Sequence, residues 1–217
     1  MPTPADACVL IPVKAFELAK ARLSPTLNDS ERAALARAMA EVVIKAALPL
    51  GVHVVCDNEE VAHFAQSLGA TIEWTTHNEL NGAVQDAVAN LSGRGMRRVV
   101  VCHADLPFAE DLFPLFDAEP TEVLLVSDRR GQGTNLCSIP LPSDFTFAYG
   151  PHSLIRHQKQ AEQCGLTVRV LQSELLSWDV DEPADLQVPT SFPGKSVLLD
   201  QGFLDAAHLT SARGSSE

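Results

Sequence analysis

Three aspartates stand where this sequence could hold a metal ion. Asp179 and Asp181 are two positions apart, so their carboxylates project from the same side of an extended segment. Two carboxylates held together need a cation between them, and a divalent metal that also binds a substrate phosphate is the usual solution. Asp105 follows the clearest apolar run, 98–102, and Pro107 turns the chain after it. Because hard cations prefer carboxylate oxygens, each acid is a candidate Mg²⁺ ligand.

Helix capping is the competing explanation for two of these acids. Asp105, taken alone, is better explained as the cap of a helix after Pro107, and Asp181 would begin a short helix at 182–185. Asp179 has no capping role available to it. The pair at 179 and 181 therefore favours a metal site.

A group of cations follows the first apolar run, 8–13. Lys14, Lys20 and Arg22 fall within nine residues of one another in a chain rich in acids. Such side chains bind triphosphates, although a solvated loop with charges at these positions explains them equally well. The loop contains no glycine, which disfavours both a Rossmann dehydrogenase and a P-loop kinase or ATPase.

Two further segments combine glycine with hydroxyl residues. The segment 129–135 reads R-R-G-Q-G-T-N, and the segment 148–153 reads A-Y-G-P-H-S and opens a predicted helix. Backbone N–H groups and hydroxyls in such places bind anions, while two ordinary turns and a helix cap are the equal alternative. No Cys or His shows the spacing of a zinc site or of a nucleophile with its base.

Alternating strands and helices must position these groups. The predicted strands are 8–13, 53–56, 71–74, 98–102, 123–127, 135–139 and 167–171, and the predicted helices are 30–48, 58–67, 81–91 and 151–164. Asn28 with Glu31 caps the first helix, and Asp57 with Glu60 caps the second. The alternation predicts an α/β three-layer fold with a mostly parallel central sheet, 135–139 being antiparallel, and helices on both faces. Ligands of such sheets bind at the carboxyl ends of the strands.

Composition limits the class of protein. With 217 residues, 46% hydrophobic and 20% charged, the chain is expected to form one domain, 1–188, followed by a tail or hairpin, 189–217. The net charge of −12 argues against nucleic acid and anionic membranes as partners. Five dispersed cysteines predict buried free thiols, and the absence of a signal peptide or spanning segment predicts a cytoplasmic protein. The tail could pack on a homodimer partner or on its own core.

The clusters resemble a known family when they are taken together and in order. They are P-V-K with A-K-A-R-L-S-P, E-L-N, A-D-L-P, G-T-N, Y-G-x-x-S and D-V-D-E-P-A-D-L, all between Val9 and Leu186. This set resembles the phospholactate guanylyltransferases of coenzyme F-420 biosynthesis. The resemblance implies transfer of GMP from GTP to the phosphate of a small phosphorylated acid, with release of pyrophosphate. It also implies a Rossmann-like nucleotidyltransferase fold, similar to that of enzymes that activate sugars or molybdopterin.

The resemblance assigns roles to individual residues. Binding of the GTP phosphates is implied for Lys14, Lys20 and Arg22, which would share the catalysis with Asp105. Binding of Mg²⁺ is implied for Asp105, Asp179 and Asp181. Binding of the phosphorylated acid is implied for Thr134, Gly150 and Ser153, and a place near the guanine for Leu80 and Asn81. A phosphate monoester is already nucleophilic at neutral pH, so positioning and charge neutralisation suffice without a covalent nucleophile.

The identity of the acid substrate is the most detailed prediction made from the sequence. Family members use 2-phospholactate, phosphoenolpyruvate or 3-phosphoglycerate. His103, His152 and Leu154 adjoin the implied acid site and depart from the residues that relatives more often hold there, which favours 3-phosphoglycerate. Two alternatives remain. A sugar or molybdopterin nucleotidyltransferase would need a glycine-rich first loop, and a non-catalytic nucleotide-binding regulator would need a broken set of acids.

Overall fold

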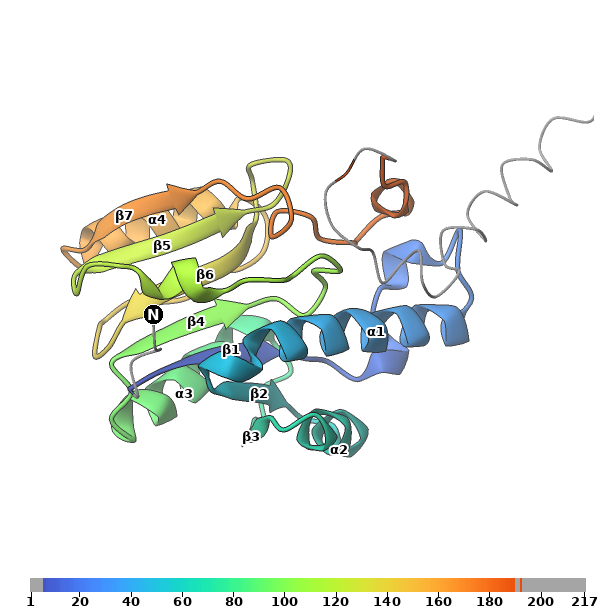
Figure 1. The fold of residues 1–217 in the computed structure, drawn as a ribbon, viewed down its shortest axis with the longest axis horizontal. Helices are drawn as coiled ribbons and strands as arrows, with labels where there is room; N and C mark the ends of the chain where they lie inside the picture. The colour runs from blue at the N-terminus through green and yellow to red at the C-terminus, as the bar shows by residue number, and fades with distance from the viewer. Residues whose placement is uncertain (1–5, 190–191, 193–217) are drawn as a thin grey trace, which may run out of the picture.

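A seven-stranded sheet forms the centre of the protein. The computed structural model describes residues 6–189 and 192. The strand order is β3-β2-β1-β4-β6-β5-β7 (Figure 1). The strands are β1 (Ala7–Pro12), β2 (Val52–Cys56), β3 (Thr71–Trp74), β4 (Arg98–Cys102), β5 (Glu122–Ser127), β6 (Thr134–Pro140) and β7 (Thr167–Leu171). Only β6 runs antiparallel to its neighbours. The predicted mostly parallel sheet, including the antiparallel strand, is confirmed.

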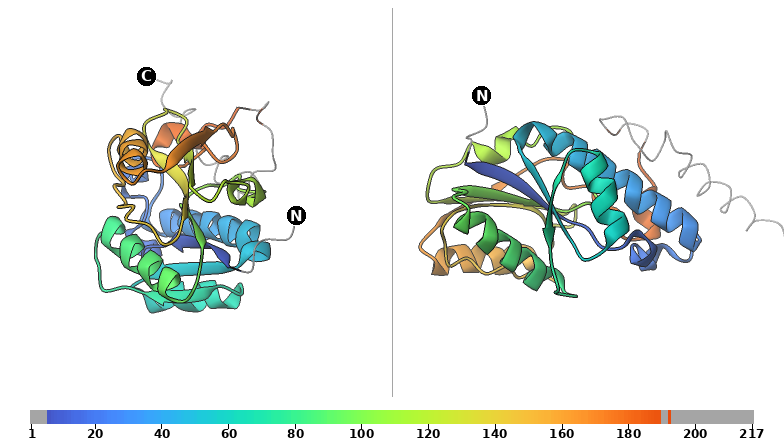
Figure 2. Two further views of the ribbon diagram at one scale, coloured as in Figure 1. Left: turned by 90° about the vertical axis from the view of Figure 1, so that its left-hand side faces the viewer. Right: turned by 90° about the horizontal axis from the view of Figure 1, so that it is seen from below.

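Four helices cover the two faces of the sheet. They are α1 (Asp29–Ala47), α2 (Glu59–Ser67), α3 (Leu80–Gly93) and α4 (Ser153–Gln163). Helices α1 and α2 lie on one face, while α3 and α4 lie on the other (Figure 2). Side chains of β1 alternate accordingly, since Val9 and Ile11 join the core under α1 and α2, and Leu10 joins the core under α3. The predicted three layers are confirmed.

The N-termini of α1 and α2 test the two capping residues predicted from the sequence. Asn28 caps α1 by accepting the N–H of Glu31, and the Glu31 side chain accepts the N–H of Asn28, so the predicted capping box is confirmed. The predicted cap at Asp57 is wrong by one position. Asn58 accepts the N–H of Val61 instead, because its own backbone is still extended and α2 begins one residue later.

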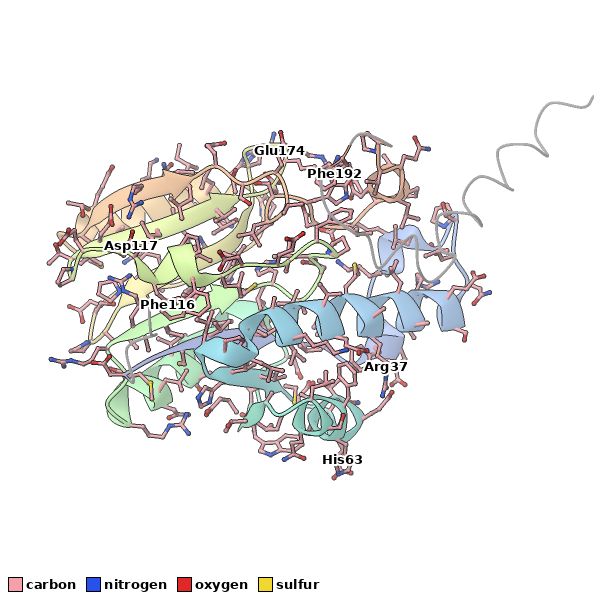
Figure 3. The ribbon with its side chains drawn as sticks, in the orientation of Figure 1. Arg37, His63, Phe116, Asp117, Glu174 and Phe192 are labelled. Carbon is pink, nitrogen blue, oxygen red and sulfur yellow. The ribbon has the colours of Figure 1, made fainter. Side chains whose placement is uncertain are left out.

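A third apolar cluster joins the first loop to the end of the domain. It contains Leu23 and Leu27 of that loop, Met39 of α1, and Phe108 and Trp178. Phe192 packs on it, with ring centroids 4.6 Å from Trp178 and 4.7 Å from Phe108 (Figure 3). This cluster holds the loop after β1, which carries the three predicted phosphate-binding cations, against the segment that carries Asp179 and Asp181. Of the predicted tail, only Pro189 and Phe192 belong to the described residues, so the rest of that prediction lies outside them.

Helices α1 and α2 are also joined at the surface. Arg37 of α1 pairs with Glu60 of α2 at 3.0 Å, and its guanidinium lies 4.4 Å from the ring centroid of Phe64 (Figure 3). Cations over aromatic faces contribute about 0.5–1 kcal/mol at exposed positions. The contact joins the two helices that cover this face of the sheet.

Candidate active site

A cleft of about 600 Å³ lies beyond the carboxyl ends of β1, β2 and β4. Its lining comes from the loop after β1, the segment after β3 and the segment after β4, which the parallel sheet brings together at one edge. Six of the predicted site residues line it: Lys14, Lys20, Arg22, Leu80, Asp105 and Asp181. The structure thus gathers in one place groups that lie far apart in the sequence.

Lys20 lies between two of the predicted metal ligands. Its Nζ donates to Oδ2 of Asp105 at 2.6 Å and to Oδ1 of Asp181 at 2.8 Å. Burial lowers the pKa of Lys20, but the two carboxylates raise it by more, so the net direction is upward. Burial likewise raises the pKa of Asp105, and the charge and hydrogen bond of Lys20 more than offset this, so the net direction is downward. Both partners are therefore held in their charged forms.

The backbone of Lys20 is strained in a way that aims its side chain. The residue has φ 54° and ψ 37°, in the left-handed region, between two short 3-10 helices (Phe16–Leu18 and Ala21–Leu23). A non-glycine residue there costs about 1–2 kcal/mol and persists only when its surroundings fix it. The two ion pairs at Asp105 and Asp181 supply that fixation. Lys14 and Arg22 are exposed by contrast.

The three aspartates predicted to bind a metal lie near one another in the structure. Oδ1 of Asp105 is buried and has no hydrogen-bond partner among the described residues. The pKa of Asp179 is raised to about 6, first by burial and then by the charges of Asp105 and Asp181. The three carboxylates therefore lie close enough to repel one another. Within residues 6–189 and 192, no three Asp, Glu, His or Cys side chains already surround a common metal position, and Lys20 lies between two of the acids.

Asp185 is a structural residue of the site that sequence reasoning missed. Its buried Oδ2 accepts the N–H groups of Asp181 at 2.9 Å and Glu182 at 2.8 Å, and its Oδ1 pairs with Arg129 and Arg130. The N-cap of the short 3-10 helix Pro183–Leu186 is Glu182 rather than Asp181, and Asp185 completes its capping box. The carboxylate of Asp181 turns to Lys20 instead. The only sequence signal was a further acid in D-V-D-E-P-A-D-L.

Asp105 does not cap a helix either. Residues 103–112 contain no helix in the structure, and the next short 3-10 helix begins only at Phe113. The carboxylate of Asp105 is directed to Lys20 instead. The capping explanation is thus removed for both acids that it had covered.

The residues implied for the acid substrate also come together. Thr134 and Ser153 are each 2% exposed, and their hydroxyl oxygens lie 3.4 Å apart. The carbonyl of Gly150 accepts the N–H of Ser153 at 3.1 Å. Because β6 is antiparallel to β4, Thr134 at the start of β6 lies at the carboxyl end of β4. There the backbone carbonyl of the next residue, Asn135, accepts the N–H of His103 at 3.0 Å.

These three residues lie beside the cleft rather than in its lining. His103 lines the cleft, and its ring centroid lies 4.9 Å from that of Tyr149, which precedes Gly150. At this junction, Nε2 of His103 and the hydroxyl of Tyr149 have no hydrogen-bond partner among the described residues. Burial lowers the pKa of His103, so its imidazole is neutral.

Leu80 and Asn81 have different surroundings. Leu80 lines the cleft, and its place near the guanine stays a prediction. The side chain of Asn81 is engaged elsewhere, since its Oδ1 accepts the N–H of Tyr149 at 2.7 Å and its Nδ2 donates to the carbonyl of Tyr149 at 3.3 Å. Asn81 thus joins the start of α3 to the segment 148–153. Its place near the guanine remains a prediction.

The cysteines are free and mainly buried, as their dispersed positions predicted. All five cysteines are free, and four are buried while Cys164 is half-buried. Burial raises the pKa of Cys8 to about 12, so its thiol stays protonated and unreactive. No helix within the described residues is both long and apolar enough to cross a membrane.

Comparison with solved structures defines the class of fold. The chain superposes with a TM-score of 0.69 on a structure described as a nucleotide-diphospho-sugar transferase from Desulfovibrio desulfuricans, with 19% identity over 95% of this chain and 98% of the other. It also resembles a cytidylyltransferase from Leptospira borgpetersenii, with a TM-score of 0.52, 12% identity and coverage of 97% and 95%. The fold is that of the nucleotidyltransferases.

The sequence identifies the family within that class. Residues 7–188 match the family described as "Guanylyl transferase CofC like", and the chain belongs to it. A phosphoenolpyruvate guanylyltransferase of Chloroflexus aggregans is 32% identical over 82% of this chain and 94% of its own length. A 2-phospho-L-lactate guanylyltransferase of Methanothermobacter thermautotrophicus is 35% identical over 82% of both chains. The chain is an enzyme of the guanylyltransferase class, which sets aside the sugar, molybdopterin and regulator alternatives.

Proposed function

We propose that the protein transfers GMP from GTP to the phosphate of a three-carbon acid phosphorylated on C2, in coenzyme F-420 biosynthesis. The names of the relatives supply two such acids, phosphoenolpyruvate and 2-phospho-L-lactate. The observation that carries the proposal is the meeting of Lys20, Asp105 and Asp181 in the cleft at the carboxyl edge of the sheet. Ligands of open α/β sheets bind at this edge.

GTP occupies the cleft in this proposal. A volume of about 600 Å³ falls within the range of small-ligand sites. Lys14 and Arg22 are exposed and can turn toward the triphosphate, Arg22 from its ion pair with Asp181 at 4.0 Å. The guanine would then lie against Leu80 and the segment after β3, which also line the cleft.

Mg²⁺ is the proposed metal, with Asp105, Asp179 and Asp181 as its proposed ligands, because hard cations prefer carboxylate oxygens. The unpartnered Oδ1 of Asp105 and the raised pKa of Asp179 both mark carboxylate charge that lacks sufficient counterion. When bound, the ion would neutralise charge on the phosphates of GTP. With the carboxylates so occupied, the ammonium group of Lys20 would be available to a phosphate oxygen of GTP.

The chemistry is a displacement at the α-phosphorus of GTP. A phosphate oxygen of the acid forms the new P–O bond, the bond to the β-phosphate breaks, and pyrophosphate leaves with the electron pair. Lys14, Lys20 and Arg22 neutralise the leaving group. Thr134, Gly150 and Ser153 orient the acid for in-line attack. Since the attacking oxygen is already ionised, no side chain has to remove a proton.

The choice of acid is open to a direct assay. Of the three residues that favour 3-phosphoglycerate, only His103 lines the cleft, whereas His152 is exposed and Leu154 borders a different pocket. We therefore rank phosphoenolpyruvate and 2-phospho-L-lactate first. 3-Phosphoglycerate remains a prediction that the same assay tests.

The test is pyrophosphate release from GTP and Mg²⁺ with each of the three acids, and mass detection of the guanylylated product. Release is expected with phosphoenolpyruvate or 2-phospho-L-lactate, and ATP and CTP in place of GTP serve as nucleotide controls. Release with 3-phosphoglycerate alone would replace our ranking. No release with any acid, from folded protein that binds GTP, would overturn the proposed function.

Three further assignments accompany this proposal. The free, buried cysteines support a place in the reducing cytoplasm. The net charge of −12 supports small anions held by a local group of cations, rather than nucleic acid or membrane, as the partners. A homodimer formed through the segment 189–217 involves residues that, apart from Pro189 and Phe192, lie outside the described part of the chain.

A further inference from the structure

His157 of α4 is a fully buried histidine beside the residues implied for the acid. It is 0% exposed and lies among aromatic rings, 4.8 Å from Tyr149 and 5.7 Å from Phe145 between centroids. A buried imidazole is costly unless its nitrogens have partners. Both nitrogens have one, since Nε2 accepts the N–H of Ala148 at 2.9 Å and Nδ1 lies 3.0 Å from Oγ1 of Thr134.

The partner of Nε2 fixes where the proton of this imidazole lies. A backbone N–H is only a donor, so Nε2 must be the unprotonated, accepting nitrogen. Burial lowers the pKa of His157 to about 4, so the ring is neutral at physiological pH. A neutral ring carries its single proton on the other nitrogen. Nδ1–H of His157 therefore donates to Oγ1 of Thr134.

This donation decides what the Thr134 hydroxyl can do. A hydroxyl has one hydrogen and two lone pairs. One lone pair of Oγ1 is taken by His157, and the hydroxyl of Ser153 lies within 3.4 Å to donate to the other. Among the described residues these are the hydrogen bonds of Oγ1, so the hydrogen of Thr134 is left to donate elsewhere. A phosphate or carboxylate oxygen of the acid substrate is a suitable acceptor for that hydrogen.

We propose that His157 is a positioning residue that holds the Thr134 hydroxyl as a hydrogen-bond donor to the acid substrate. The inference rests on the proposed function, in which Thr134 and Ser153 bind the phosphorylated acid. His157 also anchors Ala148, two residues before Gly150, through the bond to Nε2. One imidazole thereby joins the start of β6 to the segment 148–153, the two parts of the chain that supply the acid site.

Two substitutions separate the two hydrogen bonds of the ring. In His157→Gln, the amide lies near the position of Nε2 and can still accept from Ala148, but the donor to Thr134 is lost. In His157→Asn, the amide nitrogen lies near the position of Nδ1 and still donates to Thr134, while the acceptor for Ala148 is lost. Thermal unfolding of both variants shows that they are folded before kinetics are compared.

The expected result is a selective change in KM. His157→Gln should raise the KM for the acid about tenfold, the usual effect of a hydrogen bond to a charged group, and leave the KM for GTP within about twofold. His157→Asn should keep the KM for the acid within about threefold of the parent. A histidine that only fills space would give equal changes in the two variants, or changes in both KM values, and either result would overturn the inference.

A double-mutant cycle tests whether His157 acts through Thr134. Thr134→Val removes the hydroxyl and should raise the KM for the acid about tenfold or more. Adding His157→Gln to Thr134→Val should then change the KM by less than about twofold, because the group that His157 positions is already gone. Multiplicative effects in the double variant would show independent action and contradict the inference.

The activity of the unsubstituted enzyme distinguishes failure of this inference from failure of the proposed function. A parent inactive with all three acids would overturn the proposed function and the inference with it. An active parent whose KM for the acid is unchanged in His157→Gln would overturn the inference alone.

Discussion

The ammonium group of Lys20 lies 2.6 Å from a carboxylate oxygen of Asp105, although 85 positions separate the two residues in the sequence. Its second partner, Asp181, lies 2.8 Å away on the other side. The side chain of Lys20 is only 10% exposed, so these charges interact in a poorly hydrated place. The same lysine thus stabilises the fold without ligand and is a proposed contact of the GTP phosphates.

Replacing Lys20 with Met should therefore affect both stability and activity. Two carboxylates would lose their shared cation, which should lower the free energy of unfolding by about 3 kcal/mol in EDTA. Mg²⁺ should restore part of that loss, and kcat/KM should fall at least about a hundredfold. Urea unfolding with and without Mg²⁺, together with the pyrophosphate assay, measures these effects.

Lys14→Met is the matched control, since Lys14 lines the same cleft but is exposed. It should raise the KM for GTP and leave the free energy of unfolding within about 0.5 kcal/mol. If Lys20→Met proves as stable as Lys14→Met in EDTA, the structural role of the Lys20 ion pairs is wrong.

Asp179→Asn and Asp181→Asn should have opposite effects on stability and the same effect on turnover. The pKa of Asp179 is raised to about 6, so the folded protein disfavours its charged form at neutral pH. Removing that charge should stabilise the metal-free protein by about 1–2 kcal/mol. Asp181→Asn should instead destabilise it by about 1 kcal/mol, because Lys20 loses a partner.

Neither of these variants should retain turnover, because each removes a proposed Mg²⁺ ligand. Unfolding in EDTA and turnover at saturating Mg²⁺ give the two readouts separately. Full activity in either variant would remove that residue from the metal assignment.

Asn81→Ala distinguishes two roles for that residue. Its amide holds the backbone of Tyr149 through two hydrogen bonds, so its loss should loosen the segment 148–153 and raise the KM for the acid several-fold, roughly the effect of one to two hydrogen bonds. The KM for GTP should change little. A rise confined to the KM for GTP would instead support the sequence-based prediction that Asn81 lies near the guanine.

Protein stability should depend on pH through His157. Its folded-state pKa of about 4 lies below the ordinary value of 6.5, so between these values the unfolded chain binds more protons than the folded one. The contribution of His157 is fully present above pH 6.5 and should be lost progressively as the pH falls toward 4, by about 3 kcal/mol in total.

Urea unfolding between about pH 7.5 and pH 5 measures this dependence. The difference between the parent and His157→Gln cancels the other titrating groups, and the parent should show the steeper loss on acidification. Identical slopes would mean that His157 is not held neutral in the folded protein.

Local pattern was sufficient to predict the elements of this fold. All seven strands and all four helices were expected close to their observed bounds, because the period of apolar residues and the caps depend on near neighbours in sequence. The capping box at Asn28 was found for the same reason. The cap of α2 was misplaced by one residue, since Asp57 and Asn58 are both good caps and only the backbone conformation chooses between them.

The sequence by itself also determined the family and the residues to examine, because the motifs retain their order and composition along the chain. Only the tertiary structure decided how those residues pair. Lys20 with Asp181, Asn81 with Tyr149, and Thr134 with His157 are contacts across 161, 68 and 23 positions. The role of Asp185, which binds the backbone N–H of Asp181 while the Asp181 carboxylate pairs with Lys20, was likewise not predictable from the sequence. Such contacts follow from strand order and register, which no local pattern specifies.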